Sequence, residues 1–124
     1  MGILHFGAVT NSLRGTNWVV TTIAALGAYP TGLAIDPEGN LYETDRSHTV
    51  RQIVPAVTNW VVKVLAGSPG TSGTVDGTNG AARFYYPGGL AADGQGHILV
   101  ADNKLDLSPI RRNRVQRLQV AVCL

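Results

Sequence analysis

The feature that most constrains this chain is an internal repeat. Segment 29–45 (YPTGLAIDPEGNLYETD) returns as segment 86–102 (YPGGLAADGQGHILVAD), with an offset of 57 residues. Each copy contains an apolar run that ends at an Asp, a turn with Gly, and a second apolar run that ends at another Asp, which is typical of a β-hairpin. A repeat of this kind indicates an architecture of similar units packed side by side.

A second repeat places these hairpins in a larger unit. The motif Thr-Asn-Trp-Val-Val occurs at residues 16–20 and 58–62, 42 residues apart, and this period is typical of β-propeller blades. After Tyr29, short runs of Val, Ile, Leu, Tyr and Thr are bounded by Pro, Gly, Asn and Asp, as antiparallel strands are. The four strands predicted for this complete unit are residues 32–35, 40–44, 49–54 and 60–66.

The flanking sequence fits parts of the same unit. Residues 3–9 and 18–24 are predicted to be a third and a fourth strand, and a later first, second and third strand are predicted at residues 89–92, 97–101 and 114–120. The predicted organisation is the end of a preceding blade in 1–28, a complete blade in 29–66, a Gly-rich inserted loop in 67–85 and the first three strands of a second blade in 86–124.

Length differences between the two copies fall between the predicted strands, as expected if loops absorb them. The second copy has a Gly-rich insertion before its first strand and another insertion at residues 105–112. The latter raises the offset of the third strand to 65. Arg114 is matched separately with His48 of the first copy. Charged residues are only 15% of the chain, against about 25% in an average domain, and the 15 Gly residues fit a turn-rich all-β protein.

Together these residues resemble the NHL-repeat family of β-propellers. The matching elements are the Gly-rich loop with Ala-Ala-Arg-Phe at 81–84, the two Pro-x-Gly-Leu-Ala-x-Asp segments, the strands that end at Asp45 and Asp102, and His-Thr-Val-Arg-Gln-Ile at 48–53. The resemblance implies antiparallel four-stranded blades around a central channel. Propellers typically have four to eight blades and this sequence has about two, so the expected fold is an all-β, NHL-like β-propeller that is incomplete in one chain.

A partial propeller exposes strand edges and one inner sheet face, which favours association. The expected function is therefore a non-enzymatic interaction or structural module that self-associates through open blade edges into a homo-oligomeric ring or a filament. Two alternatives stay open. One is a fragment of a propeller lyase or hydrolase with a metal in the channel, and the other is a propeller face that binds RNA or another polyanion.

Carboxylates and histidines near strand ends are the candidate metal ligands. Asp45 and Asp102 could hold a cation at a channel mouth, and so could Asp36 and Asp93, which end the preceding strands. The resemblance adds His48 and His97, because related propeller lyases bind zinc through histidines. However, the two histidines occupy non-equivalent repeat positions, and an Asp after a strand usually accepts backbone N–H groups. We expect no catalytic residue, no bound metal and no cofactor.

Other residues are candidates for contacts with partners or between blades. The basic residues near the C-terminus suit a polyanion, because Arg pairs bidentately with phosphate; they are Lys104, Arg111, Arg112, Arg114 and Arg117. Trp18 and Trp60 share one repeat position and are expected to pack between blades. Glu43 and Thr44 stand where the second copy has Val100 and Ala101, which weakens one inner strand.

The remaining sequence features limit the class of protein but do not indicate a partner. A single cysteine, Cys123, excludes an intramolecular disulfide, and the net charge of +2 is too small to imply a polyanion partner by itself. The first residues lack the basic and apolar regions of a secretory signal, and no apolar window is long enough to span a membrane. Only the family resemblance points to a location, which would be extracellular.

Overall fold

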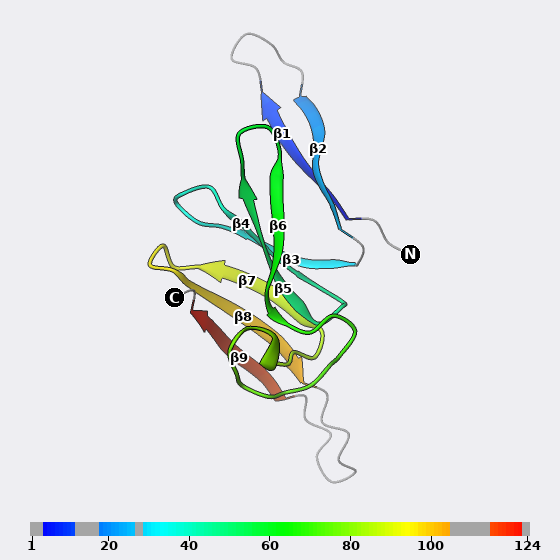
Figure 1. Cartoon of the computed structure of the whole chain (residues 1–124), viewed down its shortest axis with the longest axis vertical. Helices are drawn as coiled ribbons and strands as arrows, with labels where there is room; N and C mark the ends of the chain where they lie inside the picture. The colour runs from blue at the N-terminus through cyan, green and yellow to red at the C-terminus, as the bar shows by residue number, and fades with distance from the viewer. Residues whose placement is uncertain (1–3, 12–17, 27–28, 105–114, 123–124) are drawn as a thin grey trace.

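In the computed structural model, the described residues are 4–11, 18–26, 29–104 and 115–122. These residues form nine β-strands in three antiparallel sheets, and their one helical element is the short 3₁₀-helix η1 (Asn79–Ala81). Figure 1 shows the sheets following one another along the molecule, from the β1–β2 hairpin to β9. The expected all-β fold of antiparallel strands is confirmed.

The sheets contain two, four and three strands. The first is the hairpin of β1 (Leu4–Asn11) and β2 (Trp18–Leu26). The middle sheet has the order β3 (Pro30–Ile35), β4 (Leu41–Asp45), β5 (Thr49–Pro55) and β6 (Trp60–Gly67). The third sheet has the order β7 (Pro87–Ala92), β8 (His97–Lys104) and β9 (Val115–Val122). Every predicted strand is present, with ends that differ by a few residues.

The strand register confirms the repeat in the hairpins and corrects it in the third strand. Both hairpins keep the offset of 57, since Leu33 pairs with Glu43 and Leu90 with Val100. Beyond the insertion, however, Thr44 pairs with Val50 while Ala101 pairs with Leu118. The offset of the third strand is therefore 68 rather than the predicted 65, and the expected match of Arg114 with His48 is wrong.

Alternation along the strands gives the middle sheet two different faces. We call front face the side that carries Ala34, Tyr42, Thr44 and Val50, and back face the side that carries Leu33, Ile35, Leu41 and Glu43. The front face packs on the third sheet and forms the main core with it. This core contains Tyr42, Val50, Ala66, Phe84, Ile98 and Val100, with Ala34, Leu65, Leu90 and Ala92 at its margin.

The back face is covered only in part. A smaller cluster forms around the fully buried Ile53 of β5, against which Ile23 and Ala24 of β2 pack together with Leu41 and Trp60. The β1–β2 hairpin thus lies over β5 and β6 of the middle sheet. Leu33 and Ile35 of β3 stay 55% and 63% exposed.

The Gly-rich loop between β6 and β7 is folded on itself and contributes to the core. Its backbone is held by the bonds from Gly73 N–H to the Phe84 carbonyl (2.9 Å) and from Arg83 N–H to the Val75 carbonyl (2.9 Å). The Phe84 side chain at its end is only 3% exposed and lies in the main core. This loop therefore joins the middle and third sheets as a packed element.

Close approach of two backbones fixes the distance between these sheets. Thr31 Oγ1 donates to the Pro87 carbonyl (2.5 Å), and Thr44 Oγ1 donates to the Gly88 carbonyl (2.6 Å). A Cβ atom on Gly32 would overlap the Gly88 carbonyl oxygen. Glycine at position 32 thus allows β7 to lie directly on the front face, where β3 and β4 both contact it.

This contact predicts that Gly32→Ala lowers the free energy of unfolding by about 1–3 kcal/mol, because the added methyl group forces the two sheets apart. Urea denaturation followed by circular dichroism measures the change. Gly88→Ala is the matched control, since its Cβ would meet only the Ala101 carbonyl oxygen at 3.6 Å. Equal losses in the two variants would contradict this account of the sheet-to-sheet contact.

Candidate functional site

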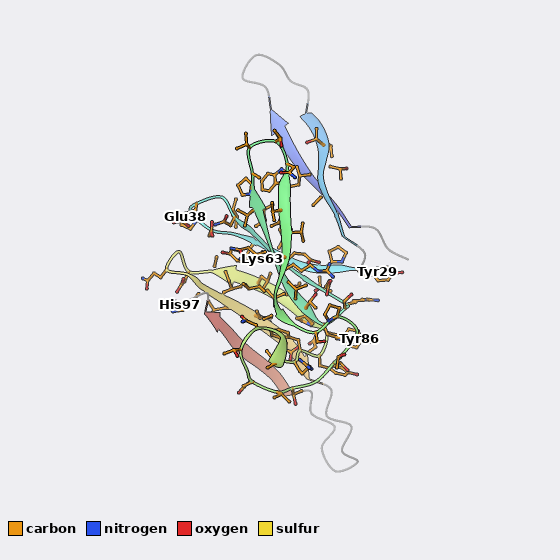
Figure 2. The ribbon with its side chains drawn as sticks, viewed as in Figure 1. Tyr29, Glu38, Lys63, Tyr86 and His97 are labelled. Carbon is orange, nitrogen blue, oxygen red and sulfur yellow. The ribbon has the colours of Figure 1, made fainter. Side chains whose placement is uncertain are left out.

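The seam between the middle and third sheets has a hollow near each of its two ends. Figure 2 labels Glu38 and His97 at one end of the seam and Tyr86 at the other. The hollow at the first end has a volume of about 350 Å³ and lies between the β3–β4 and β7–β8 turns. The hollow at the second end has a volume of about 460 Å³.

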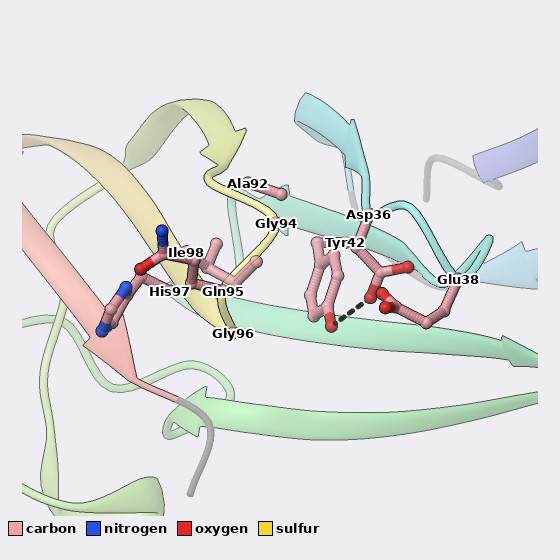
Figure 3. Close-up of a pocket in the computed structure, with 9 residues that line it drawn as sticks. All are labelled: Asp36, Glu38, Tyr42, Ala92, Gly94, Gln95, Gly96, His97 and Ile98. Atoms are coloured by element: carbon pink, nitrogen blue, oxygen red, sulfur yellow. Dashed lines mark hydrogen bonds between the residues drawn. The ribbon is translucent and has the colours of Figure 1, made fainter.

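The first hollow presents the carboxylates of Asp36 and Glu38 from the β3–β4 turn (Figure 3), and Asp36 is already engaged. Asp36 accepts hydrogen bonds from the backbone N–H of Asn40 (2.8 Å) and from the Tyr42 hydroxyl (3.0 Å), which in turn accepts one from Gln52 (3.1 Å). Burial acts to raise the pKa of Asp36, but the hydrogen bonds from Asn40 and Tyr42 hold it below its usual value. Asp36 thus remains ionised and fixes the turn.

The turn of the third sheet uses the same chemistry. Asp93 accepts the backbone N–H groups of Gln95 (2.7 Å) and His97 (3.0 Å), and its second oxygen contacts the His97 ring. The N–H of Gln95 and the His97 contacts lower the pKa of Asp93, against the opposing effect of burial. This end of the seam is therefore an anionic surface that can receive hydrogen-bond donors or a cationic side chain.

The second hollow is lined by Thr31, Arg46, Tyr86, Pro87, Gly88 and Asn103. The guanidinium carbon of Arg46 lies 5.3 Å from the centre of the Tyr29 ring, which holds it by a cation–π contact. A guanidinium beside a phenol and an amide can bind a carboxylate or a peptide carbonyl. This hollow is therefore suited to polar recognition.

His48 is part of an aromatic cluster near the second hollow. It is buried, has a positive φ of 67°, and accepts a hydrogen bond at Nδ1 from the backbone N–H of Tyr86 (3.1 Å). Its ring lies 6.1 Å from the Tyr85 ring and 4.7 Å from the Tyr86 ring. Burial lowers the pKa of His48, although the charge of Asp45 opposes this. His48 is thus held as a neutral hydrogen-bond acceptor.

The structure does not bring the two predicted histidines together. His97 lies at one end of the seam, while His48 bonds to Tyr86 at the other (Figure 2). Within the described ranges, no three His, Cys, Asp or Glu side chains are grouped as a metal ion would need. Asp45 accepts N–H bonds from Ser47 and Thr49, and Asp102 accepts one from Tyr85. The expected turn role is confirmed for Asp45, whereas Asp102 binds the backbone at the end of the Gly-rich loop instead of a turn of its own.

The predicted contact residues lie partly outside the described residues. Arg111, Arg112 and Arg114 fall outside them, while Lys104 and Arg117 lie on β8 and β9, where Lys104 pairs with Val115 and Arg117 with Asp102 in the ladder. Polyanion binding by this basic cluster stays a prediction. Trp60 is half-buried and packs on Ile53 beside residues of β2, and Trp18 begins β2. A role of both Trp residues between blades also stays a prediction.

Sequence reasoning missed a buried charged group in the middle sheet. Glu43 is fully buried, and neither of its carboxylate oxygens has a hydrogen-bond partner among the described residues. It pairs across the ladder with Arg51, whose Nη1 lies 2.9 Å from Oδ2 of the equally buried Asp45. Burial, together with the charge of Asp45, raises the pKa of Glu43 to about 7. The signal in the sequence was Glu43 at the repeat position of Val100.

A raised pKa predicts that Glu43 destabilises the folded state as pH increases. The carboxyl loses its proton near pH 4.5 in the unfolded chain and near pH 7 in the folded one, so the folded state binds more protons between these values. The free energy of unfolding should fall from about pH 4.5 to above pH 7, by at most roughly 3 kcal/mol. Urea denaturation at a series of pH values measures this.

Glu43→Gln is the control, because it keeps the shape and removes the titration. His48, with its lowered pKa, acts in the opposite direction but does so equally in both proteins. The difference between the two pH profiles therefore isolates Glu43. Parallel profiles would show that Glu43 keeps an ordinary pKa.

Comparison with known proteins identifies the repeat. Residues 84–104 match the NHL repeat. A solved structure, a structural-genomics protein of unknown function from Bacteroides thetaiotaomicron VPI-5482, is similar to 63% of this chain with 31% sequence identity and a TM-score of 0.56. The chain spans 20% of that protein's length. No curated protein matches the chain.

The matched repeat covers the end of the Gly-rich loop, the β7–β8 hairpin and its turn. NHL repeats generally mediate protein interactions, so the fold indicates an interaction or structural module. Among the described residues, no helix is long and apolar enough to cross a membrane. The match at residues 84–104 and the antiparallel sheets confirm the resemblance: the chain carries an NHL repeat, and its sheets form an incomplete NHL-type β-propeller.

Proposed function

We propose that this chain is a non-enzymatic interaction module that self-associates through its open blade edges into a ring or a filament. The observation that carries the proposal is the unequal strand number of the sheets. Counted over the described residues, the middle sheet has four strands, whereas the third has three and the first has two. Each incomplete sheet therefore offers strand edges that a neighbouring copy can pair with.

Two edges are available in particular. β9 pairs with β8 on one side and β1 pairs with β2 on one side, and neither has a second partner strand among the described residues. The unpaired N–H and C=O groups of such an edge form hydrogen bonds with an added strand, which is the usual basis of β-strand addition. An edge of this kind favours a partner that supplies another strand.

Exposed apolar side chains add to this tendency. Leu33, Ile35, Val61 and Val64 lie on strands of the middle sheet and are all about half exposed or more. Burying such side chains against a partner is favourable by roughly 25 cal/mol per Å² of apolar surface. A closed propeller typically needs four to eight blades. If each copy supplies about two blades, three or four copies would supply enough, and open addition of copies would give a filament.

The proposal predicts that the chain has a molar mass in solution that is a multiple of 13.1 kDa. Sedimentation velocity across a micromolar concentration series measures the mass, and circular dichroism confirms that the protein is folded. Electron micrographs then distinguish a ring from a filament, either of which supports self-association. A folded, stable monomer of 13.1 kDa throughout this series would contradict the proposal.

A further inference from the structure

The internal repeat gives the middle and third sheets corresponding faces, of which only one pair is in contact within the chain. We infer that the front face of β7 and β8 in one copy, which carries Gly89, Ala91 and Ala101, packs on the open back face over β3 in a second copy. This repeats between copies the contact that joins the two sheets within one chain. The inference rests on the proposed self-association and names the surfaces that meet.

The contact within the chain provides the template. In this contact the middle sheet contributes Gly32, Ala34, Tyr42 and Thr44 of its front face. The third sheet contributes its back face. Adding the offset of 57 to a residue number of the middle sheet gives the corresponding position in the third sheet. The back face of the third sheet carries Leu90, Ala92, Ile98 and Val100, which correspond to Leu33, Ile35, Leu41 and Glu43.

The back face of the middle sheet retains an apolar surface at these positions. Leu90 and Ala92 are half-buried against the main core, whereas their counterparts Leu33 and Ile35 are more than half exposed. Two large apolar side chains are thus presented side by side on the strand where the template expects a neighbouring sheet. Docking of a second copy would bury both.

The front face of the third sheet retains the shape that the template requires. Its residues Gly89, Ala91 and Ala101 correspond to Gly32, Ala34 and Thr44, and all three are exposed. Position 32 requires glycine because the Gly88 backbone lies against it, but a Cβ on Gly89 would meet no atom within 4 Å. Among the described residues, therefore, nothing requires glycine at position 89, since its φ is also ordinary. Glycine at this position would be required if the backbone of a second copy packed against it.

The β1–β2 hairpin explains which strands dock. Ile23 and Ala24 of β2 already pack on Ile53, so the hairpin occupies the outer part of the back face. The open part of the back face lies over β3. In a propeller, the first two strands of the preceding blade would cover it, and β7 and β8 are the first two strands of a blade. β8 already pairs with β9 of its own copy, so β1 of the next copy, which is also a third strand, does not lie beside β8.

Two substitutions test the inference on the whole chain. Gly89→Val places a branched side chain, favourable in a strand, where the second backbone would lie. Leu33→Lys places a charge on the opposite partner surface, across the ladder from Glu43. Both should weaken self-association at least tenfold in sedimentation velocity, with unchanged circular dichroism spectra. Val57→Lys is the control, since Val57 is fully exposed in the β5–β6 turn, and it should associate as the original chain does.

A cross-linking measurement tests the orientation directly. In a Cys123→Ser background, one protein carries Ala91→Cys and another carries Leu33→Cys. Oxidation of the mixture should give a disulfide between the two different proteins, because position 91 of one copy faces position 33 of the next, and little of either symmetric dimer.

The outcomes separate this inference from the proposed function. If the original chain is a monomer, self-association itself fails, and the inference fails with it. If the original chain associates, but both variants associate equally well and the mixed disulfide does not form, the face contact is wrong while association through strand edges stands.

Discussion

The structure depends on the close approach of β7 to the front face of the middle sheet. Gly32 leaves room for the Gly88 carbonyl, and the Thr31 and Thr44 hydroxyl groups satisfy the carbonyl groups that this approach buries. Buried carbonyls without such donors would cost about 1–3 kcal/mol each. At this distance Tyr42 and Val100 meet in one core.

The sequence allowed the hairpins to be predicted well, because strand alternation, Gly-containing turns and terminal Asp residues all act locally. Asp36 and Asp93 bind the backbone of their own turns within a few residues, so their roles could be inferred from position. The third strand of the last sheet could not be placed in the same way. Its pairing partner lies across an insertion, and a shift of three residues changes which side chains share a face.

The buried Glu43 and the hollows could not be predicted for a different reason. Burial of Glu43 results from packing between elements far apart in the sequence, and a repeat comparison shows only that Glu stands where Val100 is. Each hollow combines residues from the middle and third sheets or their turns that look ordinary in sequence. Local patterns therefore determine the units, whereas the properties of the seam arise only after two units pack together.

Divergence between the copies also bears on how tightly they associate. At the back-face positions the middle sheet has Ile35 where the third has Ala92, and a carboxyl where the third has Val100. The contact between copies would share the geometry of the internal contact without sharing its energy, because Ile35 adds apolar surface whereas Glu43 is already fully buried within the chain. A front face that binds a back face is a heterologous contact. Such contacts close into a ring only when the rotation per copy divides a full turn, and otherwise continue as a filament. The angle between the two packed sheets therefore decides between the two.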